Sequence, residues 1–400
     1  MNWLKKLKFH NMKVRHWILL ALLLLIILTK MNLRWGLTYT FFIYPHIAFC
    51  LSHVSGIFPF AIGDIFIALS IAWVILYPIY ELYIRKILIK KGIIKILIQK
   101  GIKTGCFHQA PHVFKKKTVF GRVVEYLLWV YAWFYIAWGL NYSQPNVFIR
   151  IGMAPAEVAK QDLRAFANRY VDSLNYLSEE CNLSRKGFVF EGKRNSLKVT
   201  TKDAVLYGYK KLATSSVFMG INTPFNQNPH AKTMVFSRLS SMSGVTGSMG
   251  PFFCEFTLNG DVLPHDYPAT YAHEFAHFLG VANEGEANFY SYLVCTASTD
   301  KAVKFSGYYL IFFHVLANVF DILGEKEGEA LVKRIRPEII NLAKSDRKYW
   351  LSKRCKALDA AQDFIFELYL RGNNVKEGRK SYSGVVALIL SWEQKKKMSK

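Results

Sequence analysis

Three long apolar runs dominate the first 140 residues of the chain. They cover residues 17–33, 58–80 and 123–141 and contain the segments WILLALLLLIILT, IFIALSIAWVILYPIY and YLLWVYAWFYIAWGL. A helix needs about 20 mainly apolar residues to span a bilayer, a length that the first run reaches only with its flanking residues. Trp and Tyr gather near the end of the third run, as they do at a membrane–water interface. The pattern predicts a bundle of three transmembrane helices in residues 1–145.

Basic residues give these runs an orientation. Five Lys and Arg residues and no acid precede the first run, and ten Lys and Arg residues and no acid lie between residues 85 and 117. Because cytoplasmic loops carry the excess of positive charge, we expect both segments in the cytoplasm. The residues after the first run, KMNLRWG, offer no small-residue cleavage site, so this run is predicted to remain as an anchor. Everything after residue 142 then lies outside the inner membrane of a bacterium, in the periplasm of a two-membrane cell.

The pattern changes after residue 145, where acids appear and apolar runs shorten. Two short β-like runs, 233–239 and 252–258, flank the Gly/Ser-rich segment SSMSGVTGSMG. Helical spacing of apolar residues recurs over 155–177, 203–214, 268–279, 284–298, 301–322, 337–346, 356–371 and 382–394. Residues 146–400 are therefore predicted to form an extracytoplasmic α+β domain in which helix dominates.

The formal net charge of +24 is concentrated in residues 1–122, between the apolar runs. This distribution is typical of a membrane protein, and no recognised nucleic-acid-binding motif accompanies it. We therefore expect a lipid bilayer, and not nucleic acid, as a partner. The six cysteines form no CxxC pair, so the sequence predicts neither a zinc ribbon nor a thioredoxin-like site. Their disulfide state and the oligomeric state of the chain stay open.

The motif that carries chemistry is His273-Glu274-Phe275-Ala276-His277. On a helix, residues i and i+4 share a face, so His273 and His277 can bind one metal ion. Zinc suits two neutral imidazoles and a carboxylate, with a fourth position left to water. Glu274 would lie near that water and take its proton as general base. The neighbouring residues are apolar, and buried His and Glu side chains without a role would be costly.

Two acids that open the next helix are candidates for the third ligand. Glu284 and Glu286 follow within the run NEGEAN. The helix dipole also favours acids at a helix N-terminus, so one of them can bind the metal while the other stabilises the helix. The spacing alone leaves both possibilities open.

HEFAH followed by ExxAN resembles the gluzincin pattern of zinc metallopeptidases, HExxH with a downstream ExxAD. The resemblance implies that Glu284 is the ligand, with Glu286 as the alternative. It also implies that Asn288 orients a zinc-binding His, although Asn carries no charge where the pattern has Asp. The spacing to Glu284 is shorter than in membrane gluzincins. The competing metzincin pattern would place its third ligand at Asn283, and an amide is a poor zinc ligand.

The whole chain resembles a bacterial family of three-span, membrane-anchored HExxH proteins, classified as a domain of unknown function. The segments that carry this resemblance are PFAIGD (59–64), WGLNY (138–142), GPFFCEF (250–256), HEFAHFLGVANEGEANFYSYL (273–293) and GRKSYSGVV (378–386). The resemblance implies a zincin-like domain and a membrane location, and it brings no substrate.

Together these patterns predict a membrane-anchored zinc metallopeptidase. It would hydrolyse a peptide or protein substrate with a zinc-activated water and Glu274 as general base. The alternative is a non-catalytic zinc-binding membrane protein, such as a sensor or an envelope assembly factor. In zincins an edge strand pairs with the substrate peptide, and the run 252–258 is the candidate here. His265 and Tyr382 are further candidates, as oxyanion stabilisers.

Overall fold

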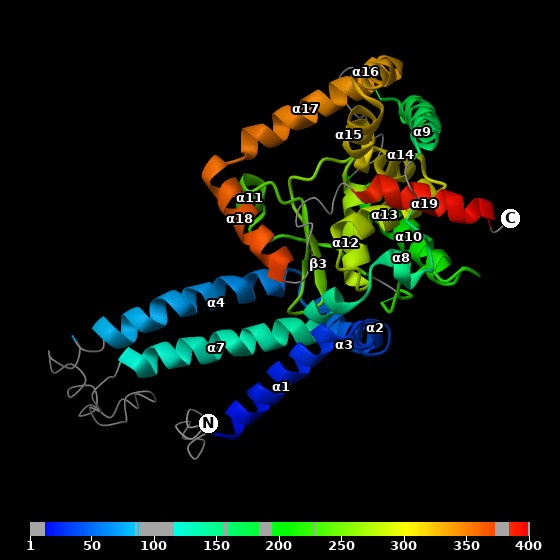
Figure 1. Cartoon of the computed structure of the whole chain (residues 1–400). Helices are drawn as coiled ribbons and strands as arrows, with labels where there is room; N and C mark the ends of the chain where they lie inside the picture. The colour runs from blue at the N-terminus through cyan, green and yellow to red at the C-terminus, as the bar shows by residue number, and fades with distance from the viewer. Residues whose placement is uncertain are drawn as a thin grey trace. The chain divides into compact units, whose positions relative to one another are not determined.

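The computed structural model describes residues 13–84, 87, 116–155, 159–183, 194–226, 229–372 and 384–398. The chain forms two compact units, whose elements are labelled in Figure 1. The first unit comprises Met1–Ile27 and Ile62–Ile136, and the second comprises Leu28–Ala61 and Ala137–Lys400. The stretch between the first two apolar runs therefore packs with the C-terminal residues, a placement that hydropathy does not reveal.

The first unit is built from long apolar helices. They are α1 (Val14–Met31), α4 (Ile62–Ile79), the π-helix η4 (Tyr80–Ile84) and α7 (Lys116–Ala137). The segments Val14–Met31, Ile62–Tyr83 and Val119–Ala137 are long and apolar enough to cross a membrane, within a few residues of the predicted runs. This finding indicates membrane association.

A fourth segment, Lys301–Leu323, also passes this test of length and composition. It is divided at Ile311 into α14 (Lys301–Leu310) and α15 (Phe312–Leu323). Its buried share is 39%, against 6–17% for the other three segments, because it packs on neighbouring helices of the second unit. Its apolar residues therefore have protein neighbours, as expected for a core helix.

Helices also dominate the second unit. A first group connects it to the apolar runs: α2 (Leu33–Thr38), the π-helix η3 (Tyr39–Ile43), α3 (Tyr44–Gly56), the 3-10 helix η5 (Gly139–Ser143) and α8 (Val147–Arg150). The remainder are α9 (Lys160–Glu180), α10 (Arg194–Ala213), α11 (Ser237–Met242), α12 (Tyr267–Phe278), α13 (Glu284–Thr296), α14, α15, α16 (Glu325–Arg334), α17 (Pro337–Lys353), α18 (Lys356–Gly372) and α19 (Val385–Met398). The sequence missed α16, which is rich in Glu and Lys and carries few apolar residues.

A small sheet of three strands completes the second unit in the described ranges. The strands β1 (Lys232–Thr233), β2 (Gly247–Gly250) and β3 (Glu255–Leu258) lie in the order β1-β3-β2. β1 is parallel to β3, and β2 is antiparallel to it, with Ser248 opposite Thr257.

Two expectations about the strands are wrong. Most of the run 233–239 is not a strand, because α11 begins at Ser237. The run 252–258 forms a strand only from Glu255, and that strand is the central one, paired with β2 along its length and with β1 at Thr257 and Leu258. It is therefore not the edge strand that was expected to pair with a substrate. The edge strands are β1 and β2, and β2 lies inside the Gly/Ser-rich segment that was expected to be a connection.

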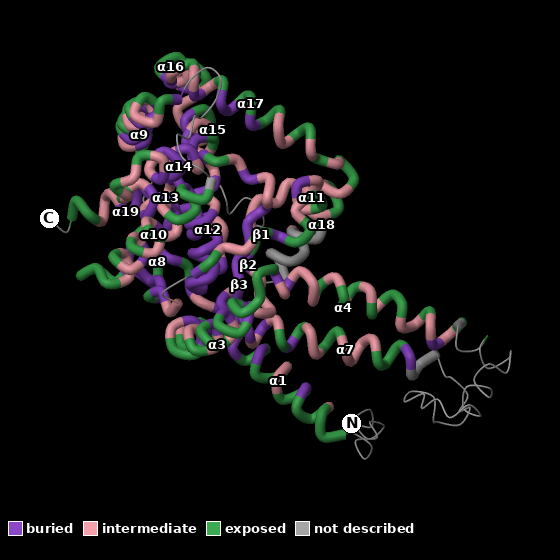
Figure 2. The backbone as a smooth tube through the Cα atoms, turned by 180° about the vertical axis from the view of Figure 1, so that it is seen from behind, coloured by how far each residue is buried: buried purple, intermediate pink, exposed green. Residues whose placement is uncertain are grey.

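The core of the second unit lies where α12 packs on β2, β3, α13 and α14 (Figure 1). Figure 2 shows α12 and α13 as largely buried helices. The fully buried Phe256 of β3 contacts Tyr271, Phe275 and Phe278 of α12, with ring centroids 5.1–5.6 Å apart. These aromatic contacts fix one side of α12 against the sheet.

Candidate metal centre

The helix α12 begins and ends where its sequence directs. Pro268 stands in its first turn, where the missing N–H costs nothing. Gly280 ends it with a φ of 95°, a left-handed conformation that favours glycine. The next helix, α13, begins after Asn283, whose side-chain oxygen accepts a hydrogen bond from the backbone N–H of Glu286 at 3.0 Å. This short connection brings the first residue of α13, Glu284, back to α12.

Three side chains converge on one point at this turn. Nε2 of His273 lies 3.1 Å from Nε2 of His277. Oε2 of Glu284 lies 3.0 Å from the first nitrogen and 3.3 Å from the second. Ligands held at 2.0–2.1 Å in a tetrahedral zinc site are separated by about 3.3 Å, so the triangle has the dimensions that such a site requires. The two histidines and Glu284 are thus brought together in the arrangement expected from the motif.

The other nitrogen of each imidazole decides which way the lone pairs point. Nδ1 of His273 lies 2.8 Å from Oδ1 of Asn288, and Nδ1 of His277 lies 2.6 Å from the carbonyl oxygen of Val281. Both partners are acceptors, so each Nδ1 carries the proton and donates. In the neutral imidazoles both Nε2 lone pairs then face the Glu284 carboxylate. Three acceptors around one point repel each other unless a cation lies between them, so the donor set fits a divalent metal.

The short distances between the imidazoles and the Glu284 carboxylate also shift the pKa values of His277 and Glu284. Burial lowers the pKa of His277, but the Glu284 carboxylate outweighs burial and raises this pKa to about 9. Burial raises the pKa of Glu284, but the two imidazoles outweigh it and hold this pKa well below its usual range. A proton on His277 therefore provides the positive charge when no metal is bound.

Glu274 lies on the buried side of the motif and is 5% exposed. Burial raises the pKa of its carboxyl group above the usual value. The two imidazoles act against this rise and the Glu284 carboxylate adds to it. The carboxyl packs against the backbone of Gly247 in the edge strand β2. A Cβ at residue 247 would lie only 2.6 Å from Cγ and 2.7 Å from Cδ of Glu274. Because glycine has no side chain, the carboxyl group of Glu274 can lie against the sheet at this position.

Glu286 has a different set of partners from Glu284. Its Oε2 accepts from Nη2 of Arg150 at 2.7 Å, and its Oε1 accepts from the backbone N–H of Val147 at 2.8 Å. Both charged side chains are buried, and Arg150 also donates to the carbonyl oxygens of Pro145 and Gly220. Glu286 therefore balances a buried arginine, while the position beside the imidazoles belongs to Glu284. The sequence analysis missed Arg150, whose only signal was a charge inside the apolar run VFIRIGM.

Four side chains bind the carbonyl oxygens at the end of α12. Helix ends leave such carbonyls without partners inside the helix. Here the oxygens of residues 277, 278, 279 and 280 accept from Trp138 at 3.1 Å, Tyr44 at 2.8 Å, Asn222 at 2.9 Å and Gln144 at 2.7 Å. Three of these donors come from segments that adjoin the apolar runs. The end of α12 is therefore held by residues that are distant in the sequence but belong to the same compact unit.

The two candidate oxyanion stabilisers lie elsewhere or outside the described residues. Nε2 of His265 lies 2.9 Å from Oδ2 of Asp346, which also accepts from the hydroxyl of Tyr309 at 2.6 Å. This buried network joins the residues before α12 to α14 and α17, at the end of α12 opposite to Gly280. Its hydrogen bonds account for His265 as a structural residue. Tyr382 lies outside the described residues.

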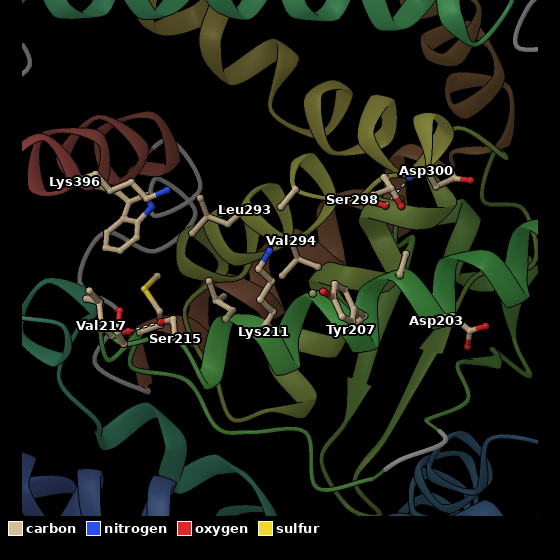
Figure 3. A pocket seen from close by; sticks show the side chains of 18 of the residues that line it. Asp203, Tyr207, Lys211, Ser215, Val217, Leu293, Val294, Ser298, Asp300 and Lys396 are labelled. Atoms are coloured by element: carbon tan, nitrogen blue, oxygen red, sulfur yellow. Dashed lines mark hydrogen bonds between the residues drawn. The ribbon is translucent and has the colours of Figure 1, made fainter. Parts of the chain in front are cut away.

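A cavity of about 970 Å³, shown in Figure 3, is not lined by any of the three converging side chains. It is lined mainly by α10, α13 and α19, including Tyr207, Leu293, Val294 and Trp392. Leu293 and Val294 are more than two helical turns along α13 from Glu284. The cavity therefore does not contain the candidate metal centre.

Comparison with known proteins gives one match. The model of a family described as a protein of unknown function (DUF3810) matches residues 39–390, which include the whole candidate centre. No curated protein and no solved structure matches the chain.

Proposed function

The chain belongs to the DUF3810 family, whose function is unknown, and from the geometry of the site we propose that it is a membrane-anchored zinc metallopeptidase of the gluzincin-like HExxH type. One observation carries the proposal. The triangle formed by Nε2 of His273, Nε2 of His277 and Oε2 of Glu284 has the edge lengths of a tetrahedral zinc site. The Nδ1 atom of each histidine is hydrogen-bonded to another residue, which leaves Nε2 for the metal. A metal-binding helix packed on a small sheet supports a zincin-like domain.

The roles of the side chains follow from their places. A zinc ion bound by the triangle supplies Lewis acidity toward a water and a carbonyl oxygen. Glu274, whose pKa is raised by burial, accepts the proton of the attacking water and passes it to the leaving amine. Asn288 and the carbonyl of Val281 hold the imidazoles in the tautomer that leaves Nε2 to the metal.

The location belongs to the same proposal. The apolar helices indicate membrane association, and the basic segments 1–15 and 85–117 support a multi-pass topology in the bacterial inner membrane. The unit that holds the site then lies on the periplasmic side, where its substrate is a peptide or protein.

Zinc analysis of the full-length protein in detergent tests the centre, with His273→Ala as the matched variant. We expect one zinc per chain in the wild type and a loss of zinc in the variant. Equal zinc content in both would overturn the site. Glu274→Gln is then expected to retain zinc but lose cleavage of a fluorogenic peptide library. Unchanged cleavage in this variant would remove the general base from the mechanism.

A further inference from the structure

The stretch that connects the first two apolar helices has an unusual composition. From Trp35 to Gly63 the chain contains no Asp, Glu, Lys or Arg over 29 residues. The chain as a whole carries 52 Lys and Arg and 28 Asp and Glu residues, so such a gap is not its ordinary surface. The stretch forms α2, η3 and α3 and belongs to the compact unit that holds the metal centre.

The burial pattern of this stretch is inverted relative to a water-exposed helix. Its polar residues Ser52 and Ser55 are buried, and their hydroxyls bond to carbonyl oxygens within α3. Tyr39 and Tyr44 are buried, but many of its other large apolar residues are exposed, with Phe42 72% and Ile57 77% exposed. The exposed apolar set is Trp35, Phe42, Ile43, Phe49, Val54, Ile57, Phe58 and Phe60. Along α3, exposed residues alternate with buried and intermediate ones. An apolar surface of this extent requires a partner.

The chain itself indicates which partner. The candidate span Val14–Met31 ends two residues before α2, and the candidate span Ile62–Tyr83 begins after Ala61. Both ends of the stretch are therefore tethered to the same face of a bilayer. Its backbone is mostly helical, so its N–H and C=O groups are satisfied without water. We propose that residues 33–60 form a lipid-facing surface, which lies in the interfacial layer of the membrane and carries the metal centre on its inner side.

Three contacts connect this lipid-facing surface to the centre. Tyr44 donates to the carbonyl oxygen of Phe278 at 2.8 Å, directly after the motif. The ammonium group of Lys232 in β1 donates to the carbonyl oxygens of Ser55 and Phe60 at 2.7 and 3.1 Å. The same group forms a buried ion pair with Glu255 of β3 at 2.6 Å. The sheet and the site helix are thus both joined to the apolar stretch.

A consequence for the substrate follows, and it rests on the proposed function. Trp138 comes directly after the candidate span Val119–Ala137, and its indole N–H donates to the carbonyl oxygen of His277. A site held this close to the ends of the spans acts at the membrane surface. Its substrates are polypeptides that are themselves anchored in the bilayer or lie on it.

The environment of the stretch can be measured in the full-length protein in lipid nanodiscs. An environment-sensitive dye is attached to Phe42→Cys or Ile57→Cys, in a chain whose accessible native cysteines, including the exposed Cys50, are replaced by serine. The matched control is Tyr176→Cys on the charged helix α9, where Tyr176 is 60% exposed. Quenching is compared between doxyl-labelled lipids and aqueous iodide.

We expect the dyes at 42 and 57 to be quenched severalfold more by the doxyl lipids than by iodide, with the reverse at 176. Iodide quenching at 42 and 57 equal to that at 176 would overturn the proposal, because the surface would face water. Protection from both quenchers would also overturn it, because protein would cover the surface. Zinc content measured on the same samples separates this result from the proposed function: loss of zinc with lipid quenching unchanged would count against the metal centre alone.

Discussion

Oδ1 of Asn288 lies 2.8 Å from Nδ1 of His273, and this hydrogen bond joins the second turn of α13 to the face of α12 that carries the two histidines. The amide oxygen can only accept, so it fixes the proton on Nδ1 and directs the lone pair of Nε2 toward Glu284. An aspartate in this place would add a negative charge to the same geometry. The neutral amide supplies orientation without that charge.

Replacing Asn288 therefore tests orientation separately from ligation. Asn288→Ala is expected to lower zinc affinity by about 10- to 100-fold, because the imidazole loses its partner. Asn288→Asp is expected to bind zinc at least as tightly as the wild type, since it keeps the acceptor and adds charge. Competition with a chromophoric chelator measures both. Equal affinity of the alanine variant and the wild type would contradict the orienting role.

Glu284 and Glu286 are two residues apart and are expected to respond differently to the same change. Glu284→Gln should abolish stoichiometric zinc binding, because it removes the anionic ligand. Glu286→Gln should keep zinc but destabilise the fold by about 3–5 kcal/mol, because Arg150 stays buried without its counter-charge. Metal analysis and thermal unfolding in detergent give the two readings. Zinc loss in Glu286→Gln with zinc retained in Glu284→Gln would reverse the assignment.

The sequence predicted the parts of the site that are local in the chain. His273 and His277 are one helical turn apart, so helical periodicity was enough to place them together. The spacing offered both Glu284 and Glu286, and the choice of Glu284 came from the resemblance to the gluzincin pattern. Helix as the dominant element was predicted from the same periodicity. The exposed face of 33–60 was not predicted, because hydropathy alone does not tell which side of an apolar helix is covered.

Contacts between distant residues could not be predicted from the sequence. Arg150 meets Glu286, and Tyr44 meets the end of α12, across more than a hundred residues, and no local pattern records such pairs. The strand β2 was missed because Gly and Ser are poor strand formers. It forms because it pairs with β3 and because Gly247 makes room for Glu274.

Zinc binding is expected to weaken as the pH falls below about 9. In the metal-free protein Glu284 raises the pKa of His277 to about 9, so His277 carries a proton at neutral pH that zinc must displace. The apparent affinity should therefore rise by about tenfold per pH unit between pH 7 and pH 9, with about one proton released at His277. Chelator competition at several pH values measures the slope, after correction for the pKa of the chelator. A flat profile over this range would contradict a protonated His277.

Gly247→Ala is expected to separate metal binding from hydrolysis. The new methyl group would lie within 2.7 Å of Cγ and Cδ of Glu274, so the carboxyl group must move, while the atoms nearest to the methyl group belong to Glu274 and not to the three proposed zinc ligands. Zinc content should stay at the wild-type level and peptide cleavage should fall by at least about 10-fold, because a positioned general base contributes about 10²–10⁴-fold to the rate and a displaced one loses part of that. Gly56→Ala, where an added Cβ meets nothing within 4 Å, is the matched control. Full activity in Gly247→Ala would mean that Glu274 needs no fixed place beside β2.

The hydrogen bonds to the carbonyl oxygens at the end of α12 are expected to stabilise the fold around the proposed metal centre. Tyr44→Phe leaves the buried carbonyl oxygen of Phe278 without its donor and should cost about 1–3 kcal/mol of stability. Tyr176→Phe, on an exposed side chain, is the control and should be neutral. Thermal unfolding of the full-length variants in detergent measures the difference.

A truncated chain of residues 146–400 carries this argument further. It lacks Tyr44, Trp138 and Gln144, so of the four donors only Asn222 remains. It keeps Arg150, Glu286 and the backbone N–H of Val147 that bonds to Glu286, but it loses the carbonyl oxygen of Pro145 to which Arg150 donates. We expect this truncated chain to aggregate or to bind zinc below stoichiometry, whereas a chain that keeps residues 28–61 and 137–145 should bind one zinc. A soluble 146–400 fragment with one tightly bound zinc would show that the membrane-adjacent segments do not hold the site.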